Sequence, residues 1–210
     1  MSKVRANARR YAHGENIMAT LDEQAQDFLN YKGRLLNHVE MVYRPGERHL
    51  VTKLFTALGC TVIDTGATHL GISVNFTHDF PSNNAMYASE VTPEQWALEQ
   101  LLQQALEGGS PLSRAYAGYE EKFRRHPQMT SHFGIRYPSF EAVEEIVARL
   151  QKDLDPELRG RVQLKGVFRP EDPGSYSKSL MQAFIKTDIA ASGLITFGQH
   201  IELQAQRNGA

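Results

Sequence analysis

Apolar residues recur along the chain with two different spacings, and their order predicts a series of strands and helices. Residues 35–43 alternate between apolar and polar side chains, which is typical of a half-buried strand. Residues 50–58 place their apolar side chains at helical spacing. Short runs at 60–64, 70–76 and 85–91 then predict three more strands. This part of the chain therefore predicts the element order βαβββ.

The same order returns in the second half of the chain. A predicted strand at 132–137 is followed by a helical stripe at 140–150 and by strand candidates at 161–168, 183–189 and 194–203. When the copies are aligned on His38 and His132, both have an apolar residue three positions on, a tyrosine five on and a proline shortly after. We therefore predict an α+β fold of two βαβββ modules that form curved mixed sheets around a shared cup.

The remaining segments lie outside this repeat. A polar, basic arm and an amphipathic helix at 15–31 form an N-terminal segment, residues 1–34. The first module covers 35–92, a connector covers 93–130, and the second module covers 131–210. Within the connector we predict a helix at 93–109, and the pattern leaves 110–129 unassigned. The loop 169–179 contains two prolines and a glycine and is long enough to serve as a lid.

The overall charge favours a small-molecule partner. The chain has 23 Lys and Arg against 24 Asp and Glu, so it carries no broad basic surface for nucleic acid or an anionic membrane. A lone cysteine, Cys60, cannot form an intrachain disulfide, which suits a reducing compartment. The early basic residues precede no apolar signal segment. We therefore predict a cytoplasmic protein.

Four residues with metal-binding chemistry occur in the order His, Glu, His, Glu. His38 and His132 open the first strand of each module, and Glu90 and Glu202 lie in strand candidates downstream. If these strands line one curved sheet, two imidazoles and two carboxylates converge on its concave side. These donors suit Zn, Ni, Mn or Fe(II), and an ion with open positions could activate water or polarise a substrate oxygen.

These residues and their order resemble the vicinal oxygen chelate superfamily, which contains glyoxalase I, methylmalonyl-CoA epimerase, type I extradiol dioxygenases and the fosfomycin and bleomycin resistance proteins. The pattern is most similar to glyoxalase I, whose metal ligands come from the first and last strands of each βαβββ module. The resemblance implies His38, Glu90, His132 and Glu202 as metal ligands. The string Gly198-Gln199-His200-Ile201-Glu202-Leu203 is its most specific piece. Proteins of this pattern often build the site from two chains, so we expect a homodimer, with the helix at 15–31 as a possible dimer surface.

Three functions remain open at this point. In a glyoxalase-like lyase or isomerase, the ion holds two adjacent substrate oxygens and Glu202 or Glu90 is the base. With His38, His132 and Glu202 alone, the site would be the facial triad of an Fe(II) ring-cleaving dioxygenase. The third possibility is a protein that binds a drug or metabolite without turnover. His200 could act as an acid or base or orient a ligand, and Arg136 could bind a carboxylate or enolate oxygen.

Overall fold

The four strands of the first βαβββ module form a five-stranded sheet, sheet A, together with the short strand β8 (Ala190–Ala191) of the second module. The computed structural model describes residues 36–74, 84–175 and 177–207. In sheet A the strand order is β2-β3-β4-β1-β8, with β1 parallel to β4 and the other pairs antiparallel. The module's elements are β1 (His38–Tyr43), α2 (Arg48–Ala57), β2 (Thr61–Ile63), β3 (His69–Ser73) and β4 (Ala85–Glu90).

The second module forms a four-stranded sheet, sheet B. Its strand order is β5-β9-β7-β6, and its first and last strands, β5 and β9, are again parallel neighbours. The predicted α+β fold with two mixed sheets is therefore confirmed, and the strand order, which the sequence pattern did not predict, is the same in both modules. The second module contains β5 (Phe133–Arg136), α5 (Phe140–Lys152), β6 (Val162–Phe168), β7 (Leu180–Thr187), β8 (Ala190–Ala191), the 3-10 turn η3 (Ile195–Phe197) and β9 (Gln199–Gln206).

The predicted strand at 194–203 is wrong in one respect, because the structure divides this segment. Residues 195–197 form η3, and Gly198 then takes a positive φ of 74° before β9 begins. A side chain at this glycine would also meet the Thr187 carbonyl at 2.9 Å. The preceding short strand, β8, leaves its own module and pairs with β1 at the edge of sheet A. The modules are therefore joined by a strand as well as by packing.

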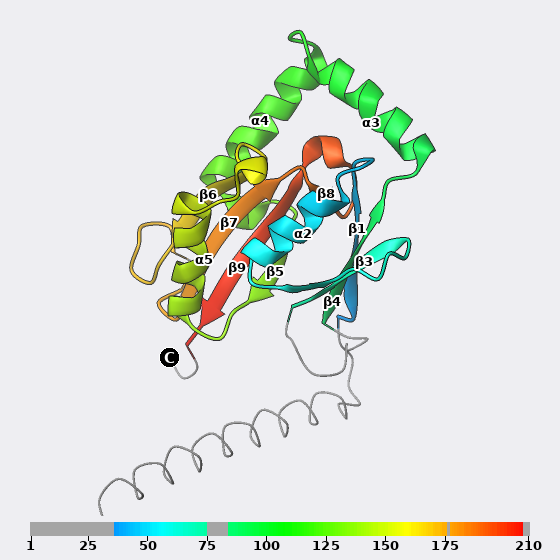
Figure 1. The fold of residues 1–210 in the computed structure, drawn as a ribbon. Coiled ribbons are helices and arrows are strands. Elements are labelled where there is room, and N and C mark those ends of the chain that lie inside the picture. The colour runs from blue at the N-terminus through cyan, green and yellow to red at the C-terminus, as the bar shows by residue number, and fades with distance from the viewer. Residues whose placement is uncertain (1–35, 75–83, 176, 208–210) are drawn as a thin grey trace, which may run out of the picture.

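Helices α2 and α5 lie side by side on one face of the sheets (Figure 1). Each helix buries one apolar stripe, and both stripes belong to a single hydrophobic core shared by the modules. The Tyr137 hydroxyl donates to the Leu58 carbonyl at 2.6 Å, and Arg149 donates to the Ala57 carbonyl at 3.0 Å. Burial of this continuous apolar surface is the main force that holds the two modules together.

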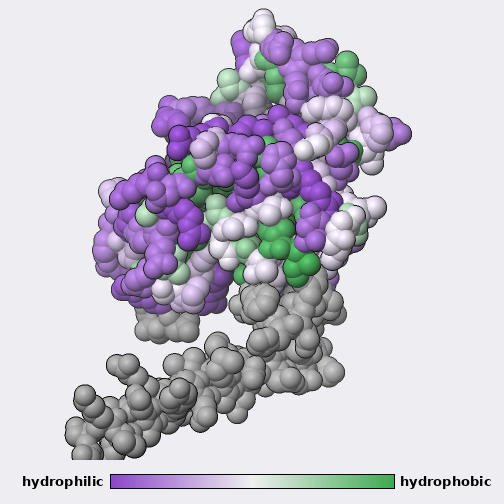
Figure 2. All heavy atoms as spheres, viewed as in Figure 1, coloured by the Kyte–Doolittle hydropathy of each residue, from purple (hydrophilic) through white to green (hydrophobic). Residues whose placement is uncertain are grey.

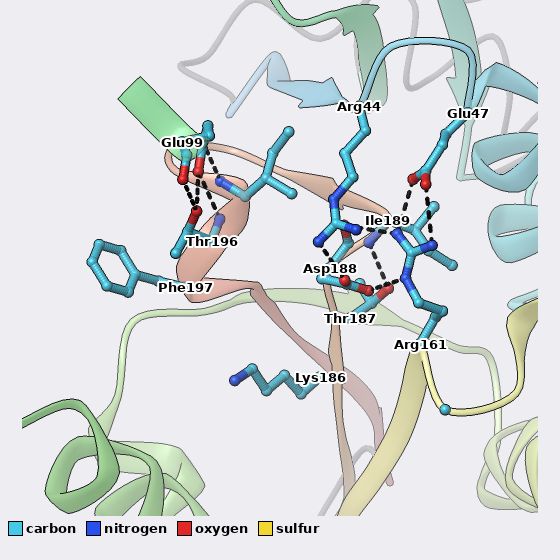
Figure 3. A network of polar contacts seen from close by, with 12 residues as sticks. Arg44, Glu47, Glu99, Arg161, Lys186, Thr187, Asp188, Ile189, Thr196 and Phe197 are labelled. Atoms are coloured by element: carbon cyan, nitrogen blue, oxygen red, sulfur yellow. Dashed lines mark hydrogen bonds and ion pairs between the residues drawn. The ribbon is translucent and has the colours of Figure 1, made fainter. Parts of the chain in front are cut away.

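A network of charged side chains also crosses between the modules (Figure 3). Asp188 accepts from Arg44 at 2.7 Å and from Arg161 at 2.5 Å. Arg161 also binds Glu47 through two nitrogens, at 2.8 and 3.2 Å. The network is partly buried and extended over several groups, which makes it more stabilising than an isolated surface pair.

The connector forms a helical hairpin at one end of the molecule, drawn in green in Figure 1. The predicted helix at 93–109 is confirmed as α3 (Pro93–Leu106). The unassigned stretch contains a second helix, α4 (Pro111–Arg125), and the 3-10 turn η1 (Pro127–Met129). The Ser110 side chain caps α4 by accepting from the Ser113 backbone at 3.0 Å, and Pro111 occupies the first turn.

The helical hairpin exposes several apolar side chains. Figure 2 shows hydrophilic residues over most of this view, with hydrophobic residues at the hairpin end and in a larger group lower in the view. Exposed apolar side chains there include Leu98, Leu101 and Leu112.

Within the described ranges, no helix combines the length and the hydropathy that a membrane span requires. The predicted helix at 15–31 and the dimer surface assigned to it lie outside the described residues.

Candidate functional site

Sheet B has one apolar face and one face that carries polar side chains as well as apolar ones. Ile201, Leu203 and Ala205 of β9 point into the hydrophobic core. The alternate residues His200 and Glu202 project to the opposite side, which we call the inner face of sheet B, as do their cross-strand neighbours. His200 is 3% exposed and Glu202 is 7% exposed. Polar side chains buried to this degree need specific partners, which the adjoining strands supply.

His132, Glu202 and Gln182 form a connected group on this face. The His132 Nδ1 atom lies 2.7 Å from the Thr130 carbonyl. Because a carbonyl only accepts, Nδ1 carries the proton, and Nε2 faces Glu202 Oε2 at 3.1 Å. Gln182 donates to the other carboxylate oxygen, Oε1, at 2.6 Å. The orientation of both the imidazole and the carboxylate is therefore fixed by neighbouring groups.

Gly134 leaves space beside the carboxylate. It pairs directly opposite Glu202 in the β5–β9 ladder, and a Cβ added there would lie 3.5 Å from Glu202 Oε2. Glycine at this position therefore keeps the approach to Oε2 open on the β5 side. The side chain of His132 is 19% exposed and that of Glu202 is 9% exposed, so the pair lies near the edge of the buried region.

Helix α4 covers the part of the inner face next to this group. Lys186 of β7 binds Glu120 at 2.7 Å and the Tyr116 hydroxyl at 2.8 Å. The Phe123 ring stacks on His200, with ring centroids 3.3 Å apart and planes within 3°. Burial lowers the pKa of His200 to about 4, so this imidazole is neutral at neutral pH. These contacts involve Lys186 and His200 and do not include Arg136 and Gln204, which pair toward the other end of the inner face.

Several buried polar atoms at this face lack a hydrogen-bond partner among the described residues. They are Gln182 Oε1, His200 Nε2 and Glu120 Oε1. Leaving such an atom buried and unpaired costs about 1–3 kcal/mol. These unpaired atoms, on β7, β9 and α4, indicate a region adapted to polar groups rather than to apolar packing alone.

His38 and Glu90 do not join this group, and the expectation that they meet each other is corrected by the register of β1 and β4. His38 pairs with Ala85 and Tyr43 pairs with Glu90, so the two residues occupy opposite ends of the ladder, about 17 Å apart along the strand. They also project from opposite faces of sheet A. Paired residues on neighbouring strands point to the same side, so Glu90 shares a face with Tyr43. Tyr43 is five residues from His38, and an odd separation along a strand places two side chains on opposite faces.

The register identifies a different counterpart of Glu202 in the first module. Glu202 pairs with Gly134, two residues after His132. The residue two after His38 is Glu40, and it pairs with Tyr87. Tyr87 therefore occupies the position of Glu202, three residues before Glu90. Glu90 is exposed, and its Oε2 accepts from the backbone of Gly46 at 2.9 Å in the turn before α2.

The surroundings of His38 and Arg136 also differ from those of His132. His38 is exposed, its Nδ1 lies 2.6 Å from Asn37 Oδ1, and its ring meets Tyr87 edge-on. Arg136 is exposed at the end of β5, opposite Gln204 and on the same face as Glu202. The guanidinium is therefore available at the uncovered end of the inner face.

Among the described residues, the second module brings together two side chains of the kinds that bind metal ions, His132 and Glu202. Within the described ranges, no three His, Cys, Asp or Glu side chains are grouped so that they could hold an ion. His132 Nε2 and Glu202 Oε2 are nevertheless 3.1 Å apart, which is about the separation of two neighbouring ligands that bind one ion at ~2.1 Å. The Nδ1 bond to a backbone carbonyl is the usual support for a ligating histidine. Gln182, whose amide nitrogen binds Glu202, has an unpaired Oε1 and is the candidate for a third donor.

Comparisons with known proteins give a loose structural likeness. No protein family model matches the sequence, and no curated protein matches it. One solved structure, described as a "putative glyoxalase family protein from Bacillus anthracis", is 9% identical, with a TM-score of 0.40, covering 85% of this chain and 98% of that one. A hypothetical protein from S. aureus is 12% identical, with a TM-score of 0.39, covering 84% and 98% of the respective chains. The fold described above depends on the chain's own strand order and register.

Sequence reasoning missed the residues that complete the polar group. Gln182 lies just before the predicted strand at 183–189, and the structure begins β7 at Leu180. Glu120 and Tyr116 lie in the stretch that the pattern left unassigned. A usable signal was present there, since Leu112, Tyr116, Tyr119 and Phe123 follow one another at helical spacing.

Proposed function

We propose that this protein is a divalent-metal-dependent lyase or isomerase that acts on a small oxygenated substrate at the inner face of sheet B. The observation that carries the proposal is the approach of His132 Nε2 to Glu202 Oε2 at 3.1 Å. Hydrogen bonds orient both side chains, from His132 to the Thr130 carbonyl and from Gln182 to Glu202. A fixed imidazole and a fixed carboxylate at the edge of a partly covered face are suited to binding and proton transfer.

His132, Glu202 and the amide oxygen of Gln182 would hold the ion. One imidazole nitrogen and two oxygens form a donor set compatible with Zn, Ni, Mn or Fe(II). When bound, the ion would supply Lewis-acid polarisation of two adjacent substrate oxygens. The site proposed here uses one module and needs neither His38 nor Glu90.

The chain's own groups have separate roles in this proposal. Glu202 is the group that accepts a proton from the substrate carbon and returns it, while Gln182 holds Oε1 in place. His200 is neutral and buried against Phe123, so in this proposal it holds α4 against the sheet and does not meet the substrate. Arg136 at the open end can bind a developing or permanent negative charge on an oxygen. Helix α4 excludes water from the opposite side of the site.

The other two functions lack a corresponding observation. A ring-cleaving Fe(II) dioxygenase needs two imidazoles and a carboxylate around one ion, and no such group of three occurs in the described part of the chain. Binding without turnover would use the same face of sheet B, and experiment distinguishes it from catalysis.

The proposal is tested by following proton transfer directly. Dihydroxyacetone, which carries adjacent oxygens and exchangeable carbon-bound protons, is incubated in D₂O with the metal-loaded protein, and proton NMR follows the loss of the C–H signals. We expect exchange that depends on added metal and is abolished in Glu202→Gln and His132→Ala. His38→Ala is the matched control in the other module and should exchange at the wild-type rate.

Two results would overturn the proposal. Exchange in Glu202→Gln equal to that of the wild type would remove the proposed base. Saturable substrate binding with no exchange above the buffer rate, for this substrate and for related hydroxyketones, would instead support a binding protein without turnover.

A further inference from the structure

The two modules can be compared position by position, because the register of each sheet is fixed. Aligning the first strands on His38 and His132 makes Tyr87 of β4 equivalent to Glu202 of β9. On the next strand, Gly71 pairs with Tyr87, and Phe184 pairs with Glu202. Gly71 is therefore the counterpart of Phe184. Two residues earlier along the same strands, His69 is the counterpart of Gln182.

In sheet B the side chain of Phe184 fills the centre of the inner face. It is fully buried, at 0% exposed. Its ring meets the His132 ring edge-on at 5.5 Å, with an interplanar angle of 85°, and meets Phe168 at 6.0 Å and 77°. These are favourable edge-to-face geometries for aromatic rings. The second module thus provides its own aromatic ring at this position.

In sheet A the equivalent position has no side chain. Gly71 lies between Tyr87 on β4 and Ile63 on β2. A pocket of about 290 Å³ lies at this point, lined by Ile63, Thr65, His69, Gly71 and Tyr87, and we call it the Gly71 pocket. The hollow therefore occurs where the second module places the ring of Phe184.

The walls of the Gly71 pocket suit an uncharged aromatic ring. The Tyr87 ring forms one wall and already meets His69 edge-on at 5.5 Å and 89°, while His38 meets it from the other side at 5.7 Å and 66°. None of the five lining residues is a carboxylate, lysine or arginine. The adjacent charge, Asp64, is held by Arg48 at 2.6 Å. Thr65 and His69 provide polar atoms that can bond one hydroxyl group.

We propose that the Gly71 pocket is a second ligand site, which binds a small uncharged molecule with one aromatic ring and a hydroxyl substituent. The ligand ring occupies the position that Phe184 fills in sheet B, against Tyr87 and Ile63. This site uses neither His132 nor Glu202, so it is independent of the function proposed for sheet B.

The probe is phenol, titrated into the full chain labelled with ¹³C at histidine Cε1. The His69 signal is assigned by its loss in His69→Asn. We expect a saturable shift of the His69 signal, with the signal of His49, on the outer helix α2, unchanged. Cyclohexanol has the same hydroxyl and a similar size without the π system, and we expect it to bind several-fold more weakly.

Gly71→Phe places the chain's own ring in the pocket, as Phe184 does in sheet B. Gly71 lies within β3 and is not among the residues with positive φ, so its backbone conformation is one that residues with side chains adopt. We expect this variant to lose phenol binding while it keeps a cooperative thermal transition. Tyr87→Leu keeps an apolar side chain and removes the ring, and we expect several-fold weaker binding.

Two outcomes would overturn the inference. One is a His69 signal that does not saturate up to the solubility limit of phenol. The other is unchanged phenol affinity in a folded Gly71→Phe variant or, if that variant does not fold, in Tyr87→Leu. Because deuterium exchange at sheet B is measured separately, failure here leaves the function proposed for sheet B unaffected.

Discussion

The imidazole of His132 and the carboxylate of Glu202 are 3.1 Å apart, although 70 positions separate them in the chain. Parallel pairing of β5 with β9 places Glu202 opposite Gly134, two residues from His132. The first module has the same strand arrangement with Tyr87 in place of the glutamate. Of the two modules, only the second therefore combines an imidazole with a carboxylate at this position.

The first prediction concerns metal content. Protein purified without a histidine tag and loaded with Zn, Ni or Mn should hold close to one ion per chain. His132→Ala and Glu202→Gln should each remove stable binding, because each deletes one of the two principal donors. Elemental analysis after gel filtration measures this. His38→Ala and Glu90→Gln are the matched controls and should retain the ion, and loss of the ion in either would restore the shared four-ligand site.

The duplicated fold could be predicted from the sequence, whereas the pairing of residues across strands could not. Hydrophobic spacing fixed the order βαβββ in both halves, because alternation and helical stripes are local properties. Glu90 was aligned with Glu202 because each is the glutamate of a last strand. A shift of one residue reverses the face of a side chain, and Glu90 lies three residues beyond Tyr87, the true counterpart. Register depends on contacts between strands that are distant in the chain. The spacing of residues within one strand carries no information about those contacts.

The second prediction concerns Gln182. Its amide holds Glu202 Oε1 at 2.6 Å, and its own oxygen is buried and unpaired. Gln182→Leu preserves the approximate volume and removes both functions, so we expect about 10-fold weaker metal binding, in the range found when a supporting hydrogen bond is lost. Competition against a chelator of known affinity measures the change. Gln204→Leu, at a less buried position on the same face, should alter affinity less than twofold.

The third prediction concerns Glu99, a fully buried carboxylate on α3. It accepts from the backbone of Ile195 at 2.7 Å and of Thr196 at 2.8 Å, and from the Thr196 hydroxyl at 2.5 Å (Figure 3). Glu99→Ala leaves these donors without a partner, so we expect the free energy of unfolding to fall by about 3 kcal/mol. Urea denaturation measures this. Glu94→Ala, an exposed glutamate on the same helix, should change it by less than about 0.5 kcal/mol. Equal effects of the two substitutions would contradict a structural role for the buried carboxylate.

The fourth prediction concerns the chain's single thiol. Cys60 is 8% exposed, and burial raises its pKa to about 12. At pH 8 only about one thiol in ten thousand is then ionised, and the thiolate is the reactive form. DTNB should therefore react very slowly with the native protein and rapidly, with one equivalent per chain, in denaturant. Fast reaction of the native protein would show that the end of α2 opens readily.

The fifth prediction concerns the attachment of α4 to sheet B. Phe123 is fully buried and stacks on His200, whereas Tyr119 on the same helix is 41% exposed. Phe123→Ala removes the main apolar contact of α4, so we expect a loss of about 3–5 kcal/mol of local stability. If α4 detaches as a unit, hydrogen exchange should accelerate in residues 114–125 while the core strands β7 and β9 stay protected. Tyr119→Ala should change exchange in α4 much less. Uniform acceleration across α4 and both strands would show instead that α4 and sheet B unfold together, and that α4 does not open as a separate cover over the site.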